Sequence, residues 1–466
     1  MRHAIHNQIM QVIHDMRYAR YLLPLLLLPV ACRQGPPSSP PSPAAAEAAS
    51  LSATEERIRD AVRARYDSSV DLLRRAVNIP SGTGNLVGVR KVGDLFSAEL
   101  AALGFETKWV SMPDSMRRAG HLVAVHPGTR GPRLLLIGHL DTVYEGAGQE
   151  WVQEDTVAKG AGTSDMKGGD VAMILALRAL ADAGQLREMH ITVVMTGDEE
   201  STGRPLSIGR AALIDAANQS DLALAFEGGS ATRVAIGRRG SSSWRLAVSA
   251  RQAHSSGIFS TGSGYGAAYE GVRILDEFRR TMVGERGLTF NVGLLAAGAN
   301  VSVDTGGVMR VDGKGNIIPP VFRASGDLRF LTEEQKESAR ARMRTIVLRP
   351  LAGAEGTISF DDSYPAMPVT PDGERLLEIF DGASRSLGYP SVGTSAPESR
   401  GAGDVSFVAP LIPGIDGLGV DGSGAHSPRE LVYLPSLRMS AERAAVFMSR
   451  LVDRWPRKGE ETVTRE

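Results

Sequence analysis

Residues 134–143 read LLLIGHLDTV, an apolar run that ends in a histidine and an aspartate. Two later stretches have the same form, because residues 191–200 read ITVVMTGDEE and residues 222–229 read LALAFEGG. Short apolar runs without polar alternation are typical of strands buried on both faces, and a helical stretch over 171–183 separates the first two. Strands that alternate with helices predict an α/β domain with a mostly parallel sheet.

Side chains that bind metals or move protons follow four apolar runs, at the point where each run ends. Ligands of open α/β sheets bind beyond the carboxyl ends of the strands, so these side chains are expected to meet. A single histidine after a strand is usually a packed or surface residue, and a single Glu-Glu pair is usually part of a solvated face. The same pattern at several strand ends is hard to explain by chance. The candidates are His139, Asp141, Glu199, Glu200, Glu227 and His426, together with Asp165 in the stretch GAGTSDMKGG.

The candidate set is chemically suited to two zinc ions. Imidazole and carboxylate are zinc ligands, and one carboxylate and one water can bridge two ions about 3.5–4 Å apart. Asp141 is placed to accept the second ring N–H of His139, which would fix the tautomer. Of Glu199 and Glu200, one can bind metal while the other acts as a general base. A phosphate-binding reading of the glycine-rich loop is weak, because no G-x-x-x-x-G-K-[ST] signature accompanies it.

A different pattern fills residues 237–363, between two stretches of α/β character. Strand and helix candidates follow one another there in the order βαββαβ, which predicts a ferredoxin-like α+β sandwich. The α/β pattern resumes in the helical stretch 373–387 and the run 415–420, so the sandwich is expected to be inserted into the α/β domain. Its strand candidates are residues 242–249, 288–295, 321–330 and 357–360, and its helix candidates are residues 267–278 and 333–347.

The first fifty residues are expected to lie outside the fold. The apolar run 21–31 follows Arg17 and Arg20 and is shorter than the roughly 20 residues that span a bilayer, a pattern typical of a secretory signal. Met16 is a candidate initiator, because a start there gives a signal of more usual length. The Pro-, Ser- and Ala-rich residues that follow predict an extended tether.

Cys32, the single cysteine of the chain, closes this apolar run. Its position resembles that of the lipidated cysteine in a bacterial lipoprotein signal, although Pro29 stands where such signals usually carry leucine. An ordinary signal cut near residues 44–46 is the alternative. A single cysteine also excludes an intramolecular disulfide and a cysteine-built zinc site.

Composition limits the classes of function. The chain has 466 residues, 42% of them hydrophobic, and its 52 basic and 53 acidic residues give a net charge of −1. The length predicts two or three domains with a large core. The balanced charge argues against a nucleic-acid binder and against a disordered acidic chain.

The ordered motifs HLDTV, GAGTSDMKGG, TGDEE, AFEGG and GAHSP resemble those of the dinuclear zinc peptidase and amidohydrolase family. That family includes bacterial glutamate carboxypeptidase, acetylornithine deacetylase, succinyl-diaminopimelate desuccinylase and aminoacylase. The resemblance covers roughly residues 65–455, including the inserted lid. The expected organisation is an export signal over 1–32, a tether over 33–51, a catalytic domain over 52–236 and 364–457, a lid and dimerisation domain over 237–363, and a disordered tail over 458–466.

By this resemblance, Asp165 would bridge two zinc ions, and its peptide bond to Met166 is typically cis in such proteins. Cobalt or manganese could replace zinc at a site built from histidine and carboxylate. The remaining ligands would be His139 and Glu227 for one ion, and Glu200 and His426 for the other.

Two further residues would serve the reaction by the same resemblance. Asp141 would orient His139, and Glu199 would take a proton from the bridging water and pass it to the leaving amine. One departure from the family pattern is Ala161, where a larger residue, often arginine, is common. The departure leaves every proposed metal ligand intact.

The lid carries three more candidates. His254 in QAHSS resembles the lid histidine that reaches the active site of the partner subunit and stabilises the oxyanion, which implies a homodimer through the lid. Asn316 in NIIP and Arg329 in DLR resemble the pair that grips the substrate carboxylate, and a guanidinium fork suits a carboxylate. The alternatives are a surface histidine and a structural salt bridge between Arg329 and Asp327.

The expected function is that of an exported zinc metallo-carboxypeptidase, in the bacterial periplasm or lipid-anchored at the cell envelope. It would hydrolyse the amide bond next to a free α-carboxylate in a small peptide, and no nucleic-acid partner is expected. An N-acyl-amino-acid deacylase of the same family is the alternative among enzymes. A turnover-deficient, zinc-dependent binding protein is the alternative outside them, and the presence of Glu199 argues against it.

Overall fold

The computed structural model describes residues 50–146, 148–304 and 307–457. The predicted export signal, with Met16 and Cys32, lies outside the described residues, as do nearly all of the tether and the whole of the tail over 458–466. Within the described ranges, no helix combines the length and the apolar content that are needed to cross a membrane.

The motifs quoted first lie on a six-stranded sheet. In their order across the sheet, the strands are β1 (Glu106–Val110), β2 (His121–His126), β6 (Met189–Thr196), β3 (Arg130–His139), β7 (Leu222–Ala225) and β19 (Gly414–Ile415). β3 pairs in parallel with β6 and β7, and β19 pairs in parallel with β7, whereas β1 and β2 form an antiparallel edge. The mostly parallel α/β sheet is therefore confirmed.

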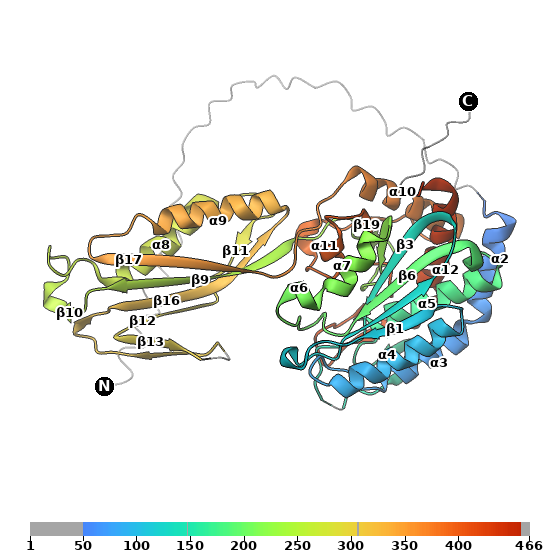
Figure 1. Cartoon of the computed structure of the whole chain (residues 1–466), viewed down its shortest axis with the longest axis horizontal. Helices are drawn as coiled ribbons and strands as arrows, with labels where there is room; N and C mark the ends of the chain where they lie inside the picture. The colour runs from blue at the N-terminus through green and yellow to red at the C-terminus, as the bar shows by residue number, and fades with distance from the viewer. Residues whose placement is uncertain (1–49, 147, 305–306, 458–466) are drawn as a thin grey trace, which may run out of the picture. The chain divides into compact units, whose positions relative to one another are not determined.

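Helices cover both faces of this sheet (Figure 1). Leu134 and Leu136 of β3 pack into one core, and the alternating residues Leu135 and Ile137 pack into another. Burial on both faces explains why the run carries no polar residue. The helices of the first core are α2 (Ala53–Ala64), α3 (Tyr66–Val77), α4 (Leu86–Ala101), α5 (Lys167–Asp182), α10 (Pro371–Ser386) and α12 (Leu434–Arg454), and those of the second are α6 (Leu206–Gly209), α7 (Ala211–Asn218) and α11 (Val405–Val408).

Residues 53–77, in which apolar residues recur with a helical period, form two helices, α2 and α3, instead of one. Ser52 caps α2 through a reciprocal pair of hydrogen bonds with Glu55. The break falls at Arg65, whose carbonyl accepts hydroxyl hydrogen bonds from Ser68 (2.8 Å) and Ser69 (3.0 Å). Hydroxyl groups that bond to a helix carbonyl compete with the backbone ladder and bend helices, so the interruption has a local cause.

The inserted segment forms a second, antiparallel sheet with a core of its own. Its elements follow the order βαββαβ along the chain, so the ferredoxin-like lid is confirmed; its boundaries at 237 and 363 stay predictions. The two central strands are β9 (Gly240–Ala250) and β16 (Val321–Phe330). β17 (Ala354–Asp362) pairs with β9, β11 (Thr289–Phe290) and β12 (Leu294–Gly298) pair with β16, and the helices are α8 (Gly266–Met282) and α9 (Glu333–Val347).

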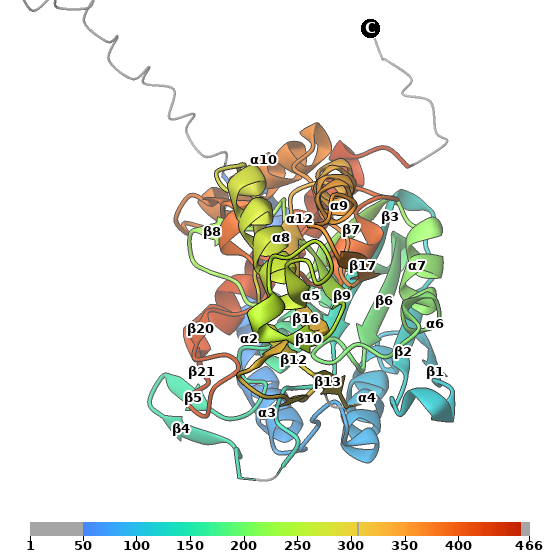
Figure 2. The ribbon, with the colours of Figure 1, turned by 90° about the vertical axis from the view of Figure 1, so that its left-hand side faces the viewer.

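Alternating residues of β9 separate the two faces of the lid sheet. Trp244, Leu246 and Val248 are buried in the lid core beneath α8 and α9, which lie over one face (Figure 2). The other face borders a hollow of about 780 Å³. Among the described residues, the lining of that hollow includes no acidic residue and no histidine, so the candidate catalytic residues lie elsewhere.

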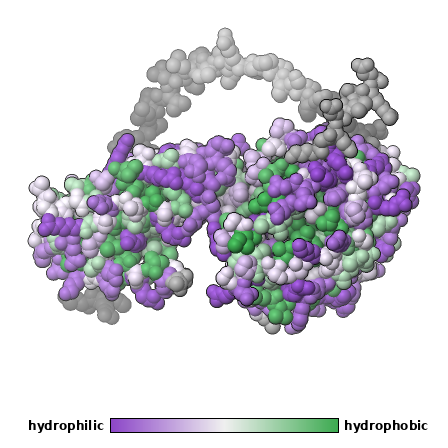
Figure 3. Space-filling view, in the orientation of Figure 1, coloured by the Kyte–Doolittle hydropathy of each residue, from purple (hydrophilic) through white to green (hydrophobic). Residues whose placement is uncertain are grey.

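Two features of the lid differ from the prediction. The expected strand 288–295 is interrupted, although Asn291 and Gly293 still donate backbone hydrogen bonds of 2.9 Å to β16. A hairpin of β13 (Asn300–Val303) and β14 (Met309–Asp312) was not expected, because its residues are mostly exposed and carry no core pattern. Val303 and Val311 of this hairpin are exposed. Figure 3 shows apolar surface among polar side chains in the part of the molecule that holds the lid.

Short strands bring distant loops together beside the main sheet. A four-stranded sheet has the order β20 (Gly422–Ser423), β21 (Leu431–Tyr433), β5 (Val157–Lys159) and β4 (Val152–Glu154). Because β21 pairs with β5, the loop 424–430 lies next to the loop 160–165. Two further pairs are β8 (Arg233–Val234) with β18 (Gly393–Thr394), and β10 (Ala253–His254) with β15 (Ile317–Ile318).

Candidate metal centre

A pocket of about 350 Å³ lies where the strands of the main sheet end. Its walls come from the loops after β6 and β7, the turn before α5 and the glycine-rich loop between β20 and β21. The strand-end rule therefore brings the predicted residues to one place, as expected. The lining includes Ser164, Asp165, Glu199, Glu200, Glu227, Arg238, Arg400 and His426.

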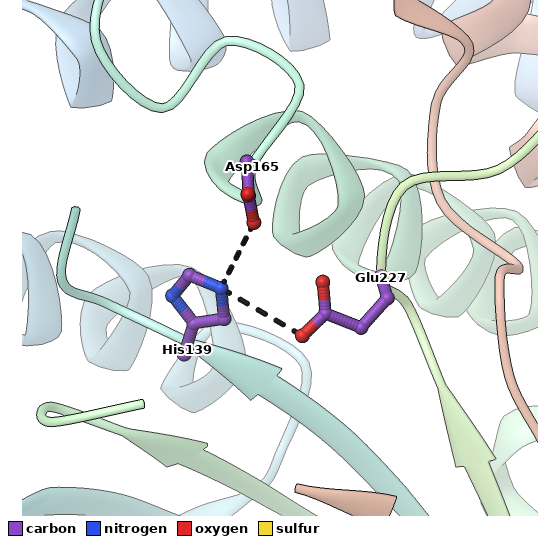
Figure 4. Close-up of side chains that lie close together, drawn as sticks. All are labelled: His139, Asp165 and Glu227. Atoms are coloured by element: carbon purple, nitrogen blue, oxygen red, sulfur yellow. Dashed lines mark hydrogen bonds and ion pairs between the residues drawn. The ribbon is translucent and has the colours of Figure 1, made fainter. Parts of the chain in front are cut away.

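One group of ligand-type atoms joins His139, Asp165 and Glu227 (Figure 4). β3 ends at His139, whose Nε2 lies 3.3 Å from Asp165 Oδ1 and 3.7 Å from Glu227 Oε1. The ligand atoms of the three residues lie within 4.8 Å of one another. Three side chains that converge in this way can hold one metal ion.

A second group joins Asp165, Glu200 and His426. Nε2 of His426 lies 3.1 Å from Asp165 Oδ2 and 3.1 Å from Glu200 Oε2. Asp165 therefore presents one carboxylate oxygen to each group. The peptide bond between Asp165 and Met166 is cis, as the resemblance implied.

Asp141 connects His139 to the turn that carries the two glutamates. Nδ1 of His139 lies 3.1 Å from the backbone carbonyl of Asp141 and 3.5 Å from its carboxylate, so the closer contact is with the carbonyl and not with the carboxylate expected from the sequence. The carboxylate accepts hydrogen bonds from the backbone N–H groups of Glu199 and Glu200, each at 3.1 Å, and from the Thr83 hydroxyl at 2.7 Å. Asp141 thereby fixes the imidazole with Nε2 facing the pocket.

Burial and mutual repulsion oppose ionisation of the glutamates. Burial raises the pKa of Glu200 to about 8 and that of Glu227 to about 7, and it raises the pKa of Glu199 well above its usual range. Burial alone would also raise the pKa of Asp165, but hydrogen bonds with His139 and His426 lower it. Bound cations would favour the ionised form of all four carboxylates, so the electrostatics of the pocket fit a metal centre.

Glu430, which sequence reasoning missed, holds the loop that carries Asp165. Its buried carboxylate accepts backbone hydrogen bonds from Gly162 (3.0 Å), Ser164 (2.9 Å) and Asp165 (3.0 Å). The sequence signal that could have identified Glu430 is its position four residues after His426, in the same glycine-rich loop. The loop with one candidate ligand thus anchors the backbone of another.

A buried ionic network supports the turn after β6. Arg210 donates to Asp198 (2.5 Å) and to Asp404 (2.9 Å), and the three side chains are almost fully buried. Asp198 also accepts a hydrogen bond from Gly203 N (2.8 Å), while Asp404 accepts one from the Thr196 hydroxyl (2.5 Å). The network closes the turn around Glu199 and Glu200, and no local sequence pattern indicated it.

The three lid candidates do not line this pocket. His254 is exposed, and its Nδ1 lies 2.8 Å from the hydroxyl of Ser256. Asn316 lies beside it, because the Asn316 carbonyl accepts a hydrogen bond from Ser255 N (3.0 Å). Arg329 lies near the other end of β16. At roughly 3.3 Å per residue, it is about 25 Å along the strand from Val321, where β16 begins. There its Nε donates to Asp327 Oδ2 at 2.8 Å.

Comparison with known proteins identifies related sequences. Residues 135–450 match the model of Peptidase family M20/M25/M40. Carboxypeptidase G2 from Pseudomonas sp. (strain RS-16) is 29% identical over 381 residues, which cover 77% of this chain and 83% of that protein. Succinyl-diaminopimelate desuccinylase 2 from Alteromonas mediterranea is 26% identical over 402 residues, which cover 83% of this chain and 99% of that protein.

Solved structures share the fold. Aminopeptidase PepT from Bacillus cereus has a TM-score of 0.67 at 19% identity and covers 85% of this chain and 98% of its own. YXEP from Bacillus subtilis, described as a dinuclear metal binding peptidase, has a TM-score of 0.60 at 13% identity and covers 84% and 99%. At these identities the likeness concerns the fold alone.

Proposed function

Because the chain belongs to peptidase family M20/M25/M40 and is a hydrolytic enzyme, we propose that it is a zinc metallo-carboxypeptidase acting on the amide bond next to a free α-carboxylate. The observation that carries this proposal is the position of Asp165, whose two carboxylate oxygens face two separate groups of ligand-type side chains. Shared ligands between two closely spaced ions are the arrangement used in dinuclear hydrolysis.

The donor set fits two zinc ions per chain. It contains imidazole and carboxylate and no thiolate, which also admits cobalt or manganese. Zinc bound there would polarise the scissile carbonyl and lower the pKa of the attacking water to about 7. His139, Asp165 and Glu227 would hold one ion, and Asp165, Glu200 and His426 the other.

Glu199 is the proposed general base. Its backbone N–H is held by Asp141 at 3.1 Å, and its carbonyl accepts a hydrogen bond from the Tyr364 hydroxyl at 2.8 Å, so the residue is anchored on both sides. Its carboxylate lies at the pocket wall, where burial raises the pKa. A base with a raised pKa holds the proton taken from water long enough to pass it to the leaving amine.

The lid residues His254, Asn316 and Arg329 are proposed to contact the substrate, His254 at the oxyanion and the other two at the carboxylate. His254 and Asn316 lie at the opposite end of the lid sheet from Arg329, which favours a contribution from a second copy. An exposed aromatic cluster supports a homodimer through the lid, since contiguous apolar surface marks interfaces. In this cluster the ring of Phe259 lies 5.3 Å from those of Tyr265 and Tyr269.

Mixing two inactive variants tests this assembly. If His254 acts in the partner's site, chains with His254→Ala should regain activity when they form mixed dimers with Asp165→Ala chains, because each mixed dimer contains one intact site. No recovery from mixed dimers that are shown to form would place His254 in its own chain's site, and full activity of His254→Ala by itself would place His254 outside the reaction.

Export to the bacterial periplasm, with a lipid anchor at Cys32, is the proposed localisation. It rests on the sequence pattern of the first 32 residues. Cys32→Ala is expected to move the protein from the membrane fraction to the soluble fraction. A wild-type protein that is already soluble would overturn the anchor.

An N-acyl-amino-acid deacylase is the second candidate function. It is favoured by the 26% identity to a desuccinylase, which spans 99% of that enzyme. A turnover-deficient binding protein is the least favoured, because Glu199 is present at the pocket wall.

Amino-acid release decides among these activities. Zinc-loaded protein is incubated with dipeptides, acyl-glutamates and N-acetyl amino acids, beside Glu199→Ala and the exposed control Glu150→Ala. We expect release that Glu199→Ala abolishes and Glu150→Ala preserves, and the ranking of substrates separates carboxypeptidase from deacylase. No release from protein that carries two metal ions per chain would contradict both activities.

A further inference from the structure

Two arginines line the acidic pocket, and they differ in their partners. Arg238 is buried, and its guanidinium lies 2.5 Å from the carboxylate of Asp416. Its Nη1 also donates to the carbonyl of Gly401 at 2.8 Å. The charge and the hydrogen bonds of Arg238 are therefore used within the fold.

Arg400 has no such partner. Its Nη2 donates to the carbonyl of Gly228 at 3.1 Å, while its buried Nε has no hydrogen-bond acceptor among the residues that the structure describes. Within those residues, no carboxylate lies at ion-pair distance from Arg400. A guanidinium has five donors in a planar fork. Among the described residues, the side chain of Arg400 makes one hydrogen bond, to Gly228, although Arg400 lines the pocket.

The contact with Gly228 gives the position of this free cation. Gly228 directly follows Glu227, a member of the first ligand group, so Arg400 lies at the edge of the candidate metal centre. A substrate's α-carboxylate is joined to the scissile carbonyl only through the amide nitrogen and the α-carbon. It is therefore the anionic group that must lie near the metal centre when the amide is attacked.

We propose that Arg400 binds the α-carboxylate of the substrate and thereby selects substrates that carry a free carboxylate next to the scissile bond. The inference rests on the proposed function and extends it to a residue of the pocket itself. A guanidinium and a carboxylate form paired, charge-assisted hydrogen bonds, which are stronger than neutral ones. A carboxylate has about four acceptor sites, so binding by Arg400 is compatible with a second contact from Arg329.

Paired substrates test the assignment. The wild type, Arg400→Met and Arg400→Lys are compared on an acyl-glutamate and on the same compound with its α-carboxylate amidated. Loss of a charged hydrogen bond predicts that Arg400→Met raises KM for the free acid by about 10- to 100-fold and leaves the amide unaffected. Arg400→Lys should recover part of the preference, because it restores the charge without the fork.

A matched control removes an arginine that touches the same segment. Arg286 pairs with Glu398, two residues before Arg400, at 3.2 Å, and it does not line the pocket. Arg286→Met should therefore keep the preference for the free acid. An equal rise of KM for acid and amide in Arg400→Met, or an unchanged preference, would overturn the proposal.

Binding separates failure of this inference from failure of the proposed function. The acyl-glutamate is titrated calorimetrically into zinc-loaded Glu199→Ala and into the double variant with Arg400→Met, with melting temperatures measured for both. Weaker binding by the double variant supports Arg400 even if the wild type turns over neither compound, an outcome that would overturn only the proposed activity. Equal binding contradicts the role of Arg400 whatever the activity.

Discussion

The main sheet and the lid sheet differ in where they place charge. Around the main sheet, His139, Asp141 and Arg210 are each at most 1% exposed. On the lid sheet, Arg329 and Asp327 form a pair that is roughly 40% exposed, at 38% and 42%. Buried charges are costly unless they are paired or bind a ligand. Buried charge in the lid, such as Glu270, is paired with an arginine, so the buried carboxylates that gather in the pocket of the main sheet are the candidates for the chemistry. The ligand groups are assembled within one region, whereas the lid presents its candidates on the surface.

The largest effect is expected at the residue shared by both ligand groups. Asp165→Ala removes an oxygen from each group, so the metal content should fall below two ions per chain. Loss of a residue that only orients a metal ligand reduces activity by up to roughly 100-fold, so kcat/KM of Asp165→Ala should fall by more than this. Elemental analysis and kinetics measure both quantities, and Asp361→Ala on the lid sheet serves as the control. If Asp165→Ala still carried two metal ions per chain, the pocket of the main sheet would no longer be distinguished from the lid as the metal-binding region.

The next largest effect is expected from removing a buried ion pair, which should lower the free energy of unfolding more than removing an exposed one. Arg210→Met leaves Asp198 and Asp404 buried without their cation, and the free energy of unfolding should fall by about 3–5 kcal/mol. Arg245 on the lid sheet forms an exposed ion pair with Asp361, so Arg245→Met should lower the free energy of unfolding by less than about 1 kcal/mol. Urea unfolding of both variants makes the comparison, and similar losses would contradict it.

Glu430 offers a test of the support around the metal centre. In Glu430→Gln, one side-chain oxygen is replaced by an amide that cannot accept from the loop N–H groups. Metal affinity, measured by competition with a chelator, is expected to weaken by about 10- to 100-fold. Glu154→Gln changes an exposed acid of the same small sheet and should leave the affinity unchanged. An unaltered affinity in Glu430→Gln would show that the loop needs no such anchor.

Two buried carboxyl groups are expected to change the stability of the protein in opposite directions when each is replaced by its neutral amide. Asp170 in α5 has no hydrogen-bond partner among the described residues, whereas Glu270 in the lid accepts two hydrogen bonds from Arg273, at 2.7 and 2.8 Å. Burial raises the pKa of Asp170 well above its usual range, so the folded chain keeps a proton that the unfolded chain loses. Stability therefore falls as the pH rises above the unfolded pKa of about 4.

The isosteric variant removes this dependence. Asp170→Asn is expected to stabilise the protein at pH 8 by about 1–3 kcal/mol and by less at pH 5, whereas Glu270→Gln should destabilise it at both values. Thermal unfolding of metal-free protein at the two pH values measures the difference. A gain for Asp170→Asn that is independent of pH would contradict the assigned cause.

The smallest effect on stability is expected for Arg329→Gln. Its pair with Asp327 is exposed, so the free energy of unfolding should change by less than about 1 kcal/mol. A raised KM with an unchanged melting temperature would support contact with substrate. If KM and the melting temperature were both unchanged, the Arg329–Asp327 pair would be a surface ion pair that does not contact the substrate.

Local patterns made much of the fold predictable. The expected strand 321–330 and helix 333–347 agree with β16 and α9 residue for residue, because their burial alternates with the period of each element. The hairpin of β13 and β14 was missed, since exposed residues carry no such period. The break between α2 and α3 at Arg65 depends on the hydroxyls of two serines, which an apolar pattern does not record.

By itself, the sequence determined the α/β and ferredoxin-like elements and the set of residues that follow the strands, because periodicity and strand ends are properties of neighbouring residues. Only the tertiary structure decided that Asp165 turns one oxygen to His139 and the other to His426. It also decided that Arg238 has an acidic partner and Arg400 has none in the described part of the chain. These contacts join segments that are far apart in the chain, and their geometry depends on how the backbone packs.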